Sequence, residues 1–241
     1  MPLTGYDETL IRFQLEKLKY KTDLQVTNSG DIAVTREGDL QFGDFQTNAL
    51  FRLVERWRQS ESTINHLFEV MFQSIQTFEK LTKSRQLGEG SSLSNNPIAF
   101  HEVTDTIIEH QLIASTLAGS IFVVLNNLLQ RFKKDLNASL DQWQSATPKI
   151  ETFSIGEIYQ AAAANFRHYD EWAATKSPTK QQLESMSVLC GLLGCPVFSE
   201  KGYPSIQTNI CEQVLLKVSK ESVDYLHEIT FEYAKKLAKY S

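Results

Sequence analysis

The sequence has few of the residues that cross-link small secreted domains or bind metals. It contains three cysteines, Cys190, Cys195 and Cys211, among 241 residues. An odd number cannot pair completely within one chain, and their spacing matches no zinc-binding pattern. We therefore expect reduced thiols, such as those buried in cytoplasmic proteins, and neither a metal site nor a cofactor.

A secretory signal and a clear membrane span are also missing. The first eight residues, Met-Pro-Leu-Thr-Gly-Tyr-Asp-Glu, have neither the basic nor the apolar region of a signal peptide. Residues 112–129 approach the length of a membrane span, but polar residues interrupt them and favour a buried core helix. These features predict a cytoplasmic protein with no membrane partner.

Positive charge is in short supply. Lys and Arg number 24 against 29 Asp and Glu, which gives a net charge of -5. This balance argues against broad electrostatic binding to nucleic acid, although it leaves room for a local basic patch. RNA is therefore a candidate partner that net charge does not support.

Standard enzyme motifs are absent as well. There is no Gly-rich phosphate loop, nucleophile elbow or His-Glu-x-x-His motif, so the sequence assigns no enzyme class. Two groups have some of the side chains of a metal site: Asp224-x-x-His227 with Glu228 and Glu232, and His101, Asp105 and Glu109. Such spacing is more typical of solvated helix faces and salt-bridged pairs, so we predict no metal ligands.

Apolar residues at helical spacing are abundant. One stripe runs from Asp44 to about Arg85 and keeps its phase through the polar residues 59–62, so one long helix and two helices are both compatible. A second long helix is expected at residues 98–143. Its middle is apolar nearly all round, which is typical of the centre of a bundle. Shorter helical patterns lie at residues 6–20 and 206–240.

Local signals mark the ends of two further helices. Ser154 and Glu157 have the spacing of a capping box, which predicts a helix from there to Trp172. Ser177-Pro178 predicts the start of another helix, because proline favours the first helical position. Gly194 predicts its end.

A repeat of eight residues precedes the long helices. Residues 23–30 (Asp-Leu-Gln-Val-Thr-Asn-Ser-Gly) are followed by residues 31–38 (Asp-Ile-Ala-Val-Thr-Arg-Glu-Gly) and by Asp-Leu-Gln-Phe at 39–42. The alternation predicts two or three short antiparallel strands that pack against the helices. One face would carry Leu24, Val26, Ile32, Val34, Leu40 and Phe42.

Together these patterns predict a mainly α protein, a helical bundle of five or more helices with a small N-terminal antiparallel β-ribbon at about residues 23–43. We expect a single helical domain over residues 1–241. Residues 1–87 would carry the N-terminal helices and the ribbon, 88–97 a flexible loop, and 98–241 the helical core.

The densest group of polar and aromatic side chains is Asn165-Phe-Arg-His-Tyr-Asp-Glu-Trp172, here called the 165–172 segment. Helical spacing aligns Asn165, His168 and Trp172 along one stripe. As a catalytic site, His168 would be the general acid or base, Arg167 the phosphate contact and Asn165 an orienting group. The binding residues would be Tyr169, Asp170, Glu171 and Trp172.

A structural role uses the same residues. Asn165 and His168 would then bond across the bundle, Arg167 would pair with Asp170 or Glu171, and Trp172 would cover the core. In that case His168→Ala should destabilise the fold, because its buried partners would be left without hydrogen bonds.

The 165–172 segment resembles segments in bacterial proteins related to the HEPN group. That group consists of helical bundles, often dimeric, and many members cut RNA in toxin–antitoxin or anti-phage systems. The resemblance covers about a dozen of the 241 residues. The group's ribonuclease motif, an arginine followed after four to six residues by a histidine, is absent. Arg167 and His168 are adjacent, and seven residues separate Arg58 from His66.

Two functions follow as hypotheses. The first is a bacterial-type helical interaction module that binds a second copy of itself or a partner protein. The alternative is a HEPN-like RNA-binding or RNA-cleaving protein of a defence or toxin–antitoxin system. A groove that exposes Arg167 and His168 would favour the alternative, and full enclosure of the segment would favour the module.

Overall fold

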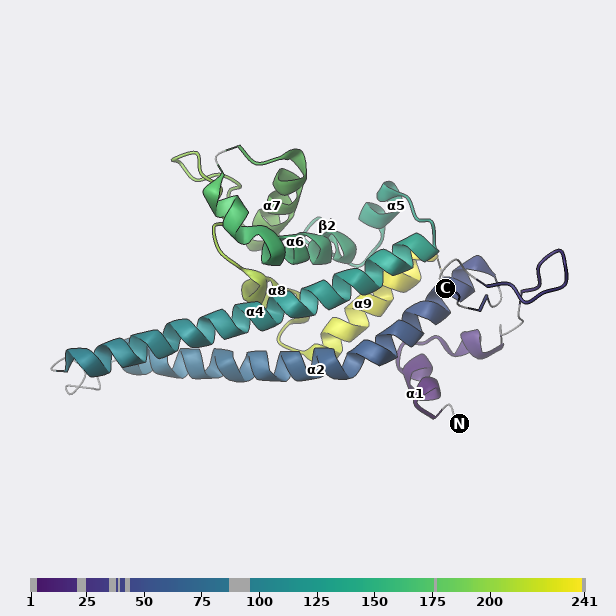
Figure 1. The fold of residues 1–241 in the computed structure, drawn as a ribbon, viewed down its shortest axis with the longest axis horizontal. Coiled ribbons are helices and arrows are strands. Elements are labelled where there is room, and N and C mark those ends of the chain that lie inside the picture. The colour runs from purple at the N-terminus through teal and green to yellow at the C-terminus, as the bar shows by residue number, and fades with distance from the viewer. Residues whose placement is uncertain are drawn as a thin grey trace. The chain divides into compact units, whose positions relative to one another are not determined.

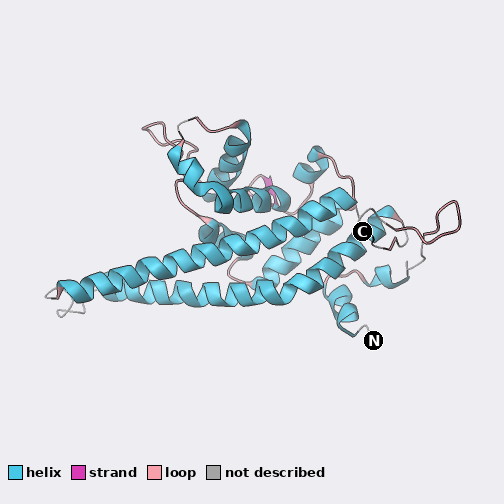
Figure 2. Cartoon of the chain, in the orientation of Figure 1, coloured by secondary structure: helices cyan, strands magenta, loops and turns pink. Residues whose placement is uncertain are grey.

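The structure, a computed structural model, describes residues 4–20, 25–34, 38, 40–41, 44–86, 96–175 and 177–239. This part contains eight α-helices, one 3-10 helix and one two-stranded antiparallel sheet (Figure 1). Figure 2 shows how far helices outnumber strands. The predicted fold class, a mainly α bundle with a small antiparallel ribbon, is confirmed.

The helices follow one another with mostly short connections. They are α1 (Thr4–Arg12), the 3-10 helix Glu16–Tyr20, α2 (Phe45–Gln86), α4 (Pro97–Asp135), α5 (Leu140–Ser145), α6 (Ile155–Ala174), α7 (Lys180–Leu193), α8 (Cys211–Ser219) and α9 (Val223–Leu237). The strands β1 (Lys149–Ile150) and β2 (Phe153–Ser154) pair between α5 and α6. Residues 88–95 of the predicted loop lie outside the described residues.

Contacts group the chain into two compact units. The first unit comprises Met1–Ser62, Leu125–Glu157 and Asp224–Ser241, and the second comprises Thr63–Val124 and Ile158–Val223. The boundaries fall inside the helices α2, α4 and α6 rather than in linkers. The single domain therefore stays a prediction.

The stripe at residues 44–85 forms one helix, α2, rather than two. The Asp44 carboxylate accepts a hydrogen bond from the Thr47 backbone N–H at 2.7 Å, which satisfies one of the free donors at the helix start. Ser60, in the polar interruption, donates its hydroxyl to the Arg56 carbonyl at 3.0 Å. This bond lets a serine remain inside the helix without a break.

Two predicted helices are shorter than their apolar patterns. The helix expected at 98–143 is wrong beyond Asp135, because Asn137 takes a left-handed conformation (φ 47°) and Ser139 then caps the separate helix α5. The segment at 6–20 also divides, at Gln14 (φ 56°), into α1 and the 3-10 helix. Apolar residues continue at helical spacing past a left-handed residue, so their pattern does not reveal where the helix ends.

Local capping signals predicted two helix ends correctly. Glu157 N–H donates to Ser154 Oγ at 3.2 Å and Ser154 N–H donates to Glu157 Oε2 at 2.9 Å, which confirms the capping box of α6. Gly194 ends α7 at φ 72°, as expected. The start of α7 lies later than predicted, because Thr179 forms its own capping box with Gln182.

The eight-residue repeat forms isolated antiparallel bridges, Val26↔Ile32 and Val34↔Leu40, where we expected longer strands. Equivalent residues of the three copies bond in a closed ring: Gln25 N–H donates to Gln41 O, Gln41 N–H to Ala33 O, and Ala33 N–H to Gln25 O. These backbone groups are therefore satisfied within the repeat.

The expected packing of the ribbon on the helices is not seen at its four described apolar residues. Val26, Ile32, Val34 and Leu40 are 45–61% exposed. Because the closed ring already pairs the backbone, the repeat does not depend on a helix to satisfy these groups. Leu24 and Phe42 lie outside the described residues.

Aromatic side chains contact one another in the core of the first unit. Phe13 stacks on Phe231 with ring centroids 3.8 Å apart, and Trp57 packs edge-on against both rings. Tyr233 donates its hydroxyl to the Trp143 carbonyl at 2.8 Å and meets that indole at a right angle. These contacts hold α2, α5 and α9 together.

The core of the second unit depends on close helix approach. The Phe166 ring of α6 lies against Gly119 of α4, in the space that a Cβ at residue 119 would occupy.

By length and composition α4 is the one described helix that could cross a membrane, and half of its most apolar 18-residue window is buried. A core helix of a soluble protein meets the same criteria, so α4 is weak evidence for a membrane.

Candidate functional site

The 165–172 segment lies in α6, and its two ends are buried. The Asn165 side chain is fully enclosed: its Nδ2 donates to the Thr208 carbonyl at 3.2 Å and its Oδ1 accepts from the Ile210 N–H at 3.0 Å. Ile210 precedes α8 and receives no cap from its own side chain. Asn165 therefore holds the entry to α8 from a neighbouring helix.

Trp172 is 1% exposed, and three of the four preceding alanines, Ala161 to Ala163, are buried as well. The short alanine side chains allow α8 to lie close to α6. The hydrogen bond from Cys211 Sγ to the Ala162 carbonyl, at 3.3 Å, shows this close approach. The alanine run is thus a packing surface. Trp172 belongs to the buried core of the second unit.

The middle of the segment is exposed. Arg167, His168, Tyr169, Asp170 and Glu171 all face solvent. His168 Nδ1 lies 3.0 Å from Glu171 Oε1, with the two side chains 47% and 59% exposed. A carboxylate at Nδ1 can orient an imidazole for proton transfer at Nε2, as in a general acid–base pair.

The predicted stripe of Asn165, His168 and Trp172 is therefore divided between core and surface. Two cavities of the described part, considered below, contain no residue of the segment. The structure thus gives Asn165 and Trp172 packing roles. A catalytic role for His168 stays a prediction.

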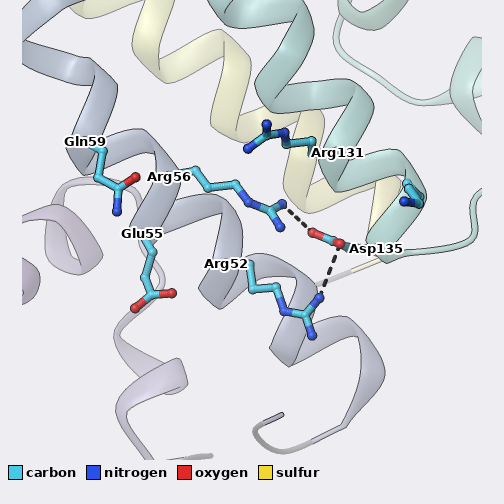
Figure 3. A pocket seen from close by; sticks show the side chains of 7 residues that line it. Arg52, Glu55, Arg56, Gln59, Arg131 and Asp135 are labelled. Atoms are coloured by element: carbon cyan, nitrogen blue, oxygen red, sulfur yellow. Dashed lines mark hydrogen bonds and ion pairs between the residues drawn. The ribbon is translucent and has the colours of Figure 1, made fainter. Parts of the chain in front are cut away.

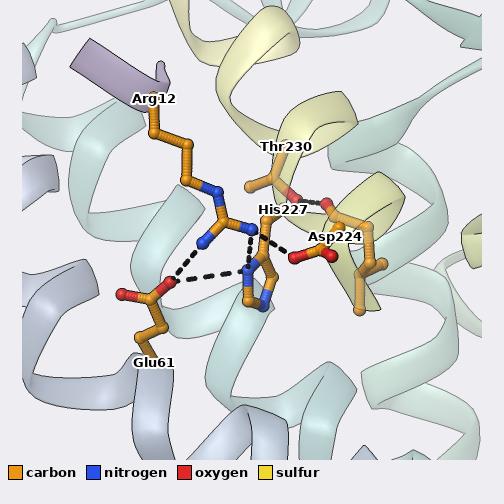
Figure 4. Close-up of polar contacts among 6 residues, drawn as sticks. Arg12, Glu61, Asp224, His227 and Thr230 are labelled. Carbon is orange, nitrogen blue, oxygen red and sulfur yellow. Dashed lines mark hydrogen bonds and ion pairs between the residues drawn. The ribbon is translucent and has the colours of Figure 1, made fainter. Parts of the chain in front are cut away.

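The metal-like groups hold no cluster that could bind a metal ion within the described residues. His101, Asp105 and Glu109 are exposed, as are Glu228 and Glu232. Arg12 takes the place of a cation beside Asp224 and His227 (Figure 4). Its Nη2 lies 2.6 Å from Asp224 Oδ1 and 3.2 Å from His227 Nδ1.

Burial governs the chemistry of His227. Burial, reinforced by the neighbouring Arg12 guanidinium, lowers the pKa of His227 from 6.5 to about 4, against the opposing effect of Asp224. Because arginine only donates, Nδ1 must accept the bond and the proton must lie on Nε2. The imidazole packs at a right angle to Trp57, with ring centroids 4.8 Å apart. We interpret this group as a structural element of the first unit.

A cavity lined by charged side chains lies elsewhere in the first unit, between α2 and α4. We call it the basic cavity. Its volume is about 560 Å³, and it is lined by Arg52, Glu55, Arg56, Gln59, Arg131, Lys134 and Asp135. Four of these side chains are cationic and two are acidic, which gives a formal charge of +2 in a chain whose net charge is -5.

Asp135 holds two arginines at this cavity (Figure 3). Arg56 Nη1 lies 2.5 Å from Asp135 Oδ2, and Arg52 Nη1 lies 3.3 Å from Oδ1. The side chains of Arg52, Arg56 and Asp135 are 8%, 17% and 10% exposed. Arg52 Nε is buried without an acceptor. One carboxylate thus serves two guanidinium groups, and the cavity keeps an excess of donors and of positive charge.

Sequence reasoning missed this site. On α2 its residues occupy positions 52, 55, 56 and 59, which fall off the apolar stripe and share one helix face. On α4 they occupy positions 131, 134 and 135. Each set alone has the pattern of a solvated helix face, so only the tertiary fold distinguishes them.

A second cavity of the first unit, about 600 Å³, is lined by residues of both charges. One of its lysines, Lys235, already donates to the Phe13 carbonyl at 3.1 Å. It therefore offers a less concentrated positive charge than the basic cavity.

No protein-family model, curated protein or solved structure matches this chain.

Proposed function

We propose that this chain is a non-enzymatic helical binding module that takes a phosphate-bearing ligand in the basic cavity of its first unit. The observation that carries the proposal is the pair Arg52 and Arg56, held by a single carboxylate beside the cationic residues Arg131 and Lys134. Guanidinium groups bind phosphate oxygens through paired, charge-assisted hydrogen bonds.

Pre-organisation supports this proposal. Arg52 and Arg56 are largely buried and fixed by Asp135, so binding need not pay the full entropy of ordering two long side chains. Arg131 extends from α4 toward α2 and is exposed (Figure 3). It can therefore close on a ligand while the buried pair stays in place.

The size and lining of the cavity define the ligand class. About 560 Å³ lies within the usual range for small-molecule sites, roughly 300–1,000 Å³. A nucleotide, a phosphorylated metabolite or a short stretch of phosphodiester backbone has suitable size. The lining residues are all polar or charged, which disfavours an apolar ligand.

Isothermal titration calorimetry of the full chain with pyrophosphate, ATP and a short single-stranded RNA tests the proposal. We expect at least one of them to bind, and Arg131→Ala to weaken that binding about tenfold or more. A charge-assisted hydrogen bond contributes roughly 1.5–3 kcal/mol, and about 1.4 kcal/mol corresponds to a factor of ten. Arg131 takes no part in the Asp135 pairings, so this variant should keep its fold.

Lys180→Ala is the matched control. It also removes one positive charge, but from a side chain of the second unit that is 93% exposed. Equal affinities of Arg131→Ala and the wild type, or equal losses in both variants, would overturn the site. Binding of RNA without binding of ATP or pyrophosphate would identify a polymer rather than a nucleotide as the ligand.

The exposed His168–Glu171 pair favours a second function, that of a HEPN-like protein that binds or cuts RNA in a defence or toxin–antitoxin system. His168 would act through Nε2, and Arg167 would contact phosphate. Expression of the wild type and His168→Ala in bacteria tests this. Growth arrest with RNA cleavage that the variant lacks would support a ribonuclease, and normal growth with intact RNA in both would count against it.

Exposed apolar side chains on α4 support a protein partner, either a second copy or another chain. Ile98, Ile108 and Leu112 are 72%, 55% and 67% exposed, and Ile108 and Leu112 are neighbours on the helix surface. Light scattering of the wild type and Leu112→Glu tests self-association. We expect a dimer that this charge dissociates, whereas a wild-type monomer would exclude the second copy.

A further inference from the structure

Two of the three cysteines meet at the end of α7. Cys190 and Cys195 lie on either side of the turn that ends α7, where their side chains influence one another, and neither takes part in a disulfide. Cys190 lies in the last turn of α7 and is 1% exposed, whereas Cys195 follows Gly194 and is half-buried. The pair therefore joins an enclosed thiol to one that solvent reaches.

The backbone fixes this meeting. The Cys195 N–H donates to the Cys190 carbonyl at 3.0 Å, and Gly194 supplies the left-handed turn between them. Such a turn brings a residue of the last helical turn against the second residue beyond the helix, usually as an apolar contact. Here both positions are cysteines, so the same turn brings two thiol side chains together.

Cys211 provides a contrast within the same unit. It is fully buried and directs its Sγ to the Ala162 carbonyl at 3.3 Å. Burial raises the pKa of Cys211 to about 12, and burial together with the contact to Cys195 does the same for Cys190. Cys190 and Cys211 are buried and Cys195 is half-buried, so Cys195 is the member of the three that an oxidant meets first.

We infer that Cys190 and Cys195 form a redox-active dithiol that a peroxide converts to an intramolecular disulfide. In the first step the Cys195 sulfur attacks the peroxide O–O bond, giving a sulfenic acid and, from hydrogen peroxide, one water. In the second step the Cys190 sulfur displaces the sulfenic oxygen, which leaves with the Cys190 proton as a second water. The peroxide is reduced by two electrons, and a thiol reductant reverses the closure. This inference is independent of the proposed ligand.

Peptide mapping of the native full chain tests it. Trypsin releases residues 181–201 as one peptide with both cysteines, because no lysine or arginine lies between Lys180 and Lys201. After hydrogen peroxide, unfolding and alkylation, we expect this peptide to lose two hydrogen atoms and take no alkyl group. Dithiothreitol should restore two alkylation sites. Cys211 should remain alkylated throughout.

Two variants sharpen the test. Cys195→Ser changes a half-buried residue beyond the helix, and it should leave Cys190 open to alkylation after peroxide treatment and unfolding. Cys211→Ala is the matched control and should close the disulfide as the wild type does. The inference is overturned if Cys195 oxidises to sulfinic acid while Cys190 stays a thiol, if neither reacts, or if the disulfides join separate chains.

Discussion

Replacing Asn165 by alanine should destabilise the chain far more than replacing His168, although both belong to one polar segment. The Asn165 amide is fully enclosed and bonds the Ile210 N–H and the Thr208 carbonyl. Ile210 is itself buried, so its N–H would lose its acceptor in a place that water reaches poorly. A buried donor without a partner costs roughly 1–3 kcal/mol, and the space left by the amide adds to that cost.

We therefore expect Asn165→Ala to lower the free energy of unfolding by about 2–4 kcal/mol. His168→Ala, at a side chain 47% exposed, should change it by no more than about 0.5 kcal/mol. Urea unfolding followed by far-ultraviolet circular dichroism measures both. Equal effects, or a larger effect at His168, would refute the division of the segment into buried ends and an exposed middle.

Two other perturbations test contacts inside the units, one at Gly119 in the second unit and one at His227 in the first. Gly119→Ala should destabilise the chain by about 1–3 kcal/mol, because the new Cβ would overlap the Phe166 ring. Thermal unfolding measures this change, and unchanged stability would contradict the close approach of α4 and α6. Between pH 7 and pH 5 the unfolded state protonates His227 but the folded state, with its pKa lowered to about 4, does not. The free energy of unfolding should therefore decrease as the pH is lowered from 7 to 5, and His227 should account for about 2 kcal/mol of that decrease. His227→Gln, which keeps an acceptor for Arg12, should remove the contribution of His227 to the pH dependence of stability. If the variant and the wild type show the same pH dependence, the lowered pKa of His227 is contradicted.

Features set by a few neighbouring residues could be predicted from the sequence. The Ser154–Glu157 capping box and the Gly194 helix end involve residues at most a few positions apart, and both are as expected. The end of α4 was not predictable from periodicity. The apolar pattern continues through Leu136, Leu140 and Trp143, although the chain turns at Asn137.

The orientation of α6 about its own axis decides which side chains of the 165–172 segment face the core, and the sequence predicts that orientation only in part. Trp172 lies seven positions after Asn165, almost two whole turns, so both face the core. His168 lies about 60° away from Asn165 around the helix, at about 100° per residue. Where one face ends and the next begins depends on the neighbouring helices, which sequence spacing does not describe.

The basic cavity depends on pairing between distant residues. Arg52 and Asp135 are 83 positions apart, and Arg56 and Asp135 are 79 apart. A sequence shows each as a polar residue on an amphipathic helix. Only the packing of α2 against α4 in the first unit shows that two arginines share one carboxylate beside Arg131 and Lys134.

A crystal structure of the full chain grown with pyrophosphate would test the proposed phosphate site most directly. We expect pyrophosphate to bind between α2 and α4, with its oxygens in contact with Arg131 and with the pair held by Asp135. Pyrophosphate bound at the second cavity, or at the exposed face of α6 while the basic cavity holds only solvent, would contradict the proposed site.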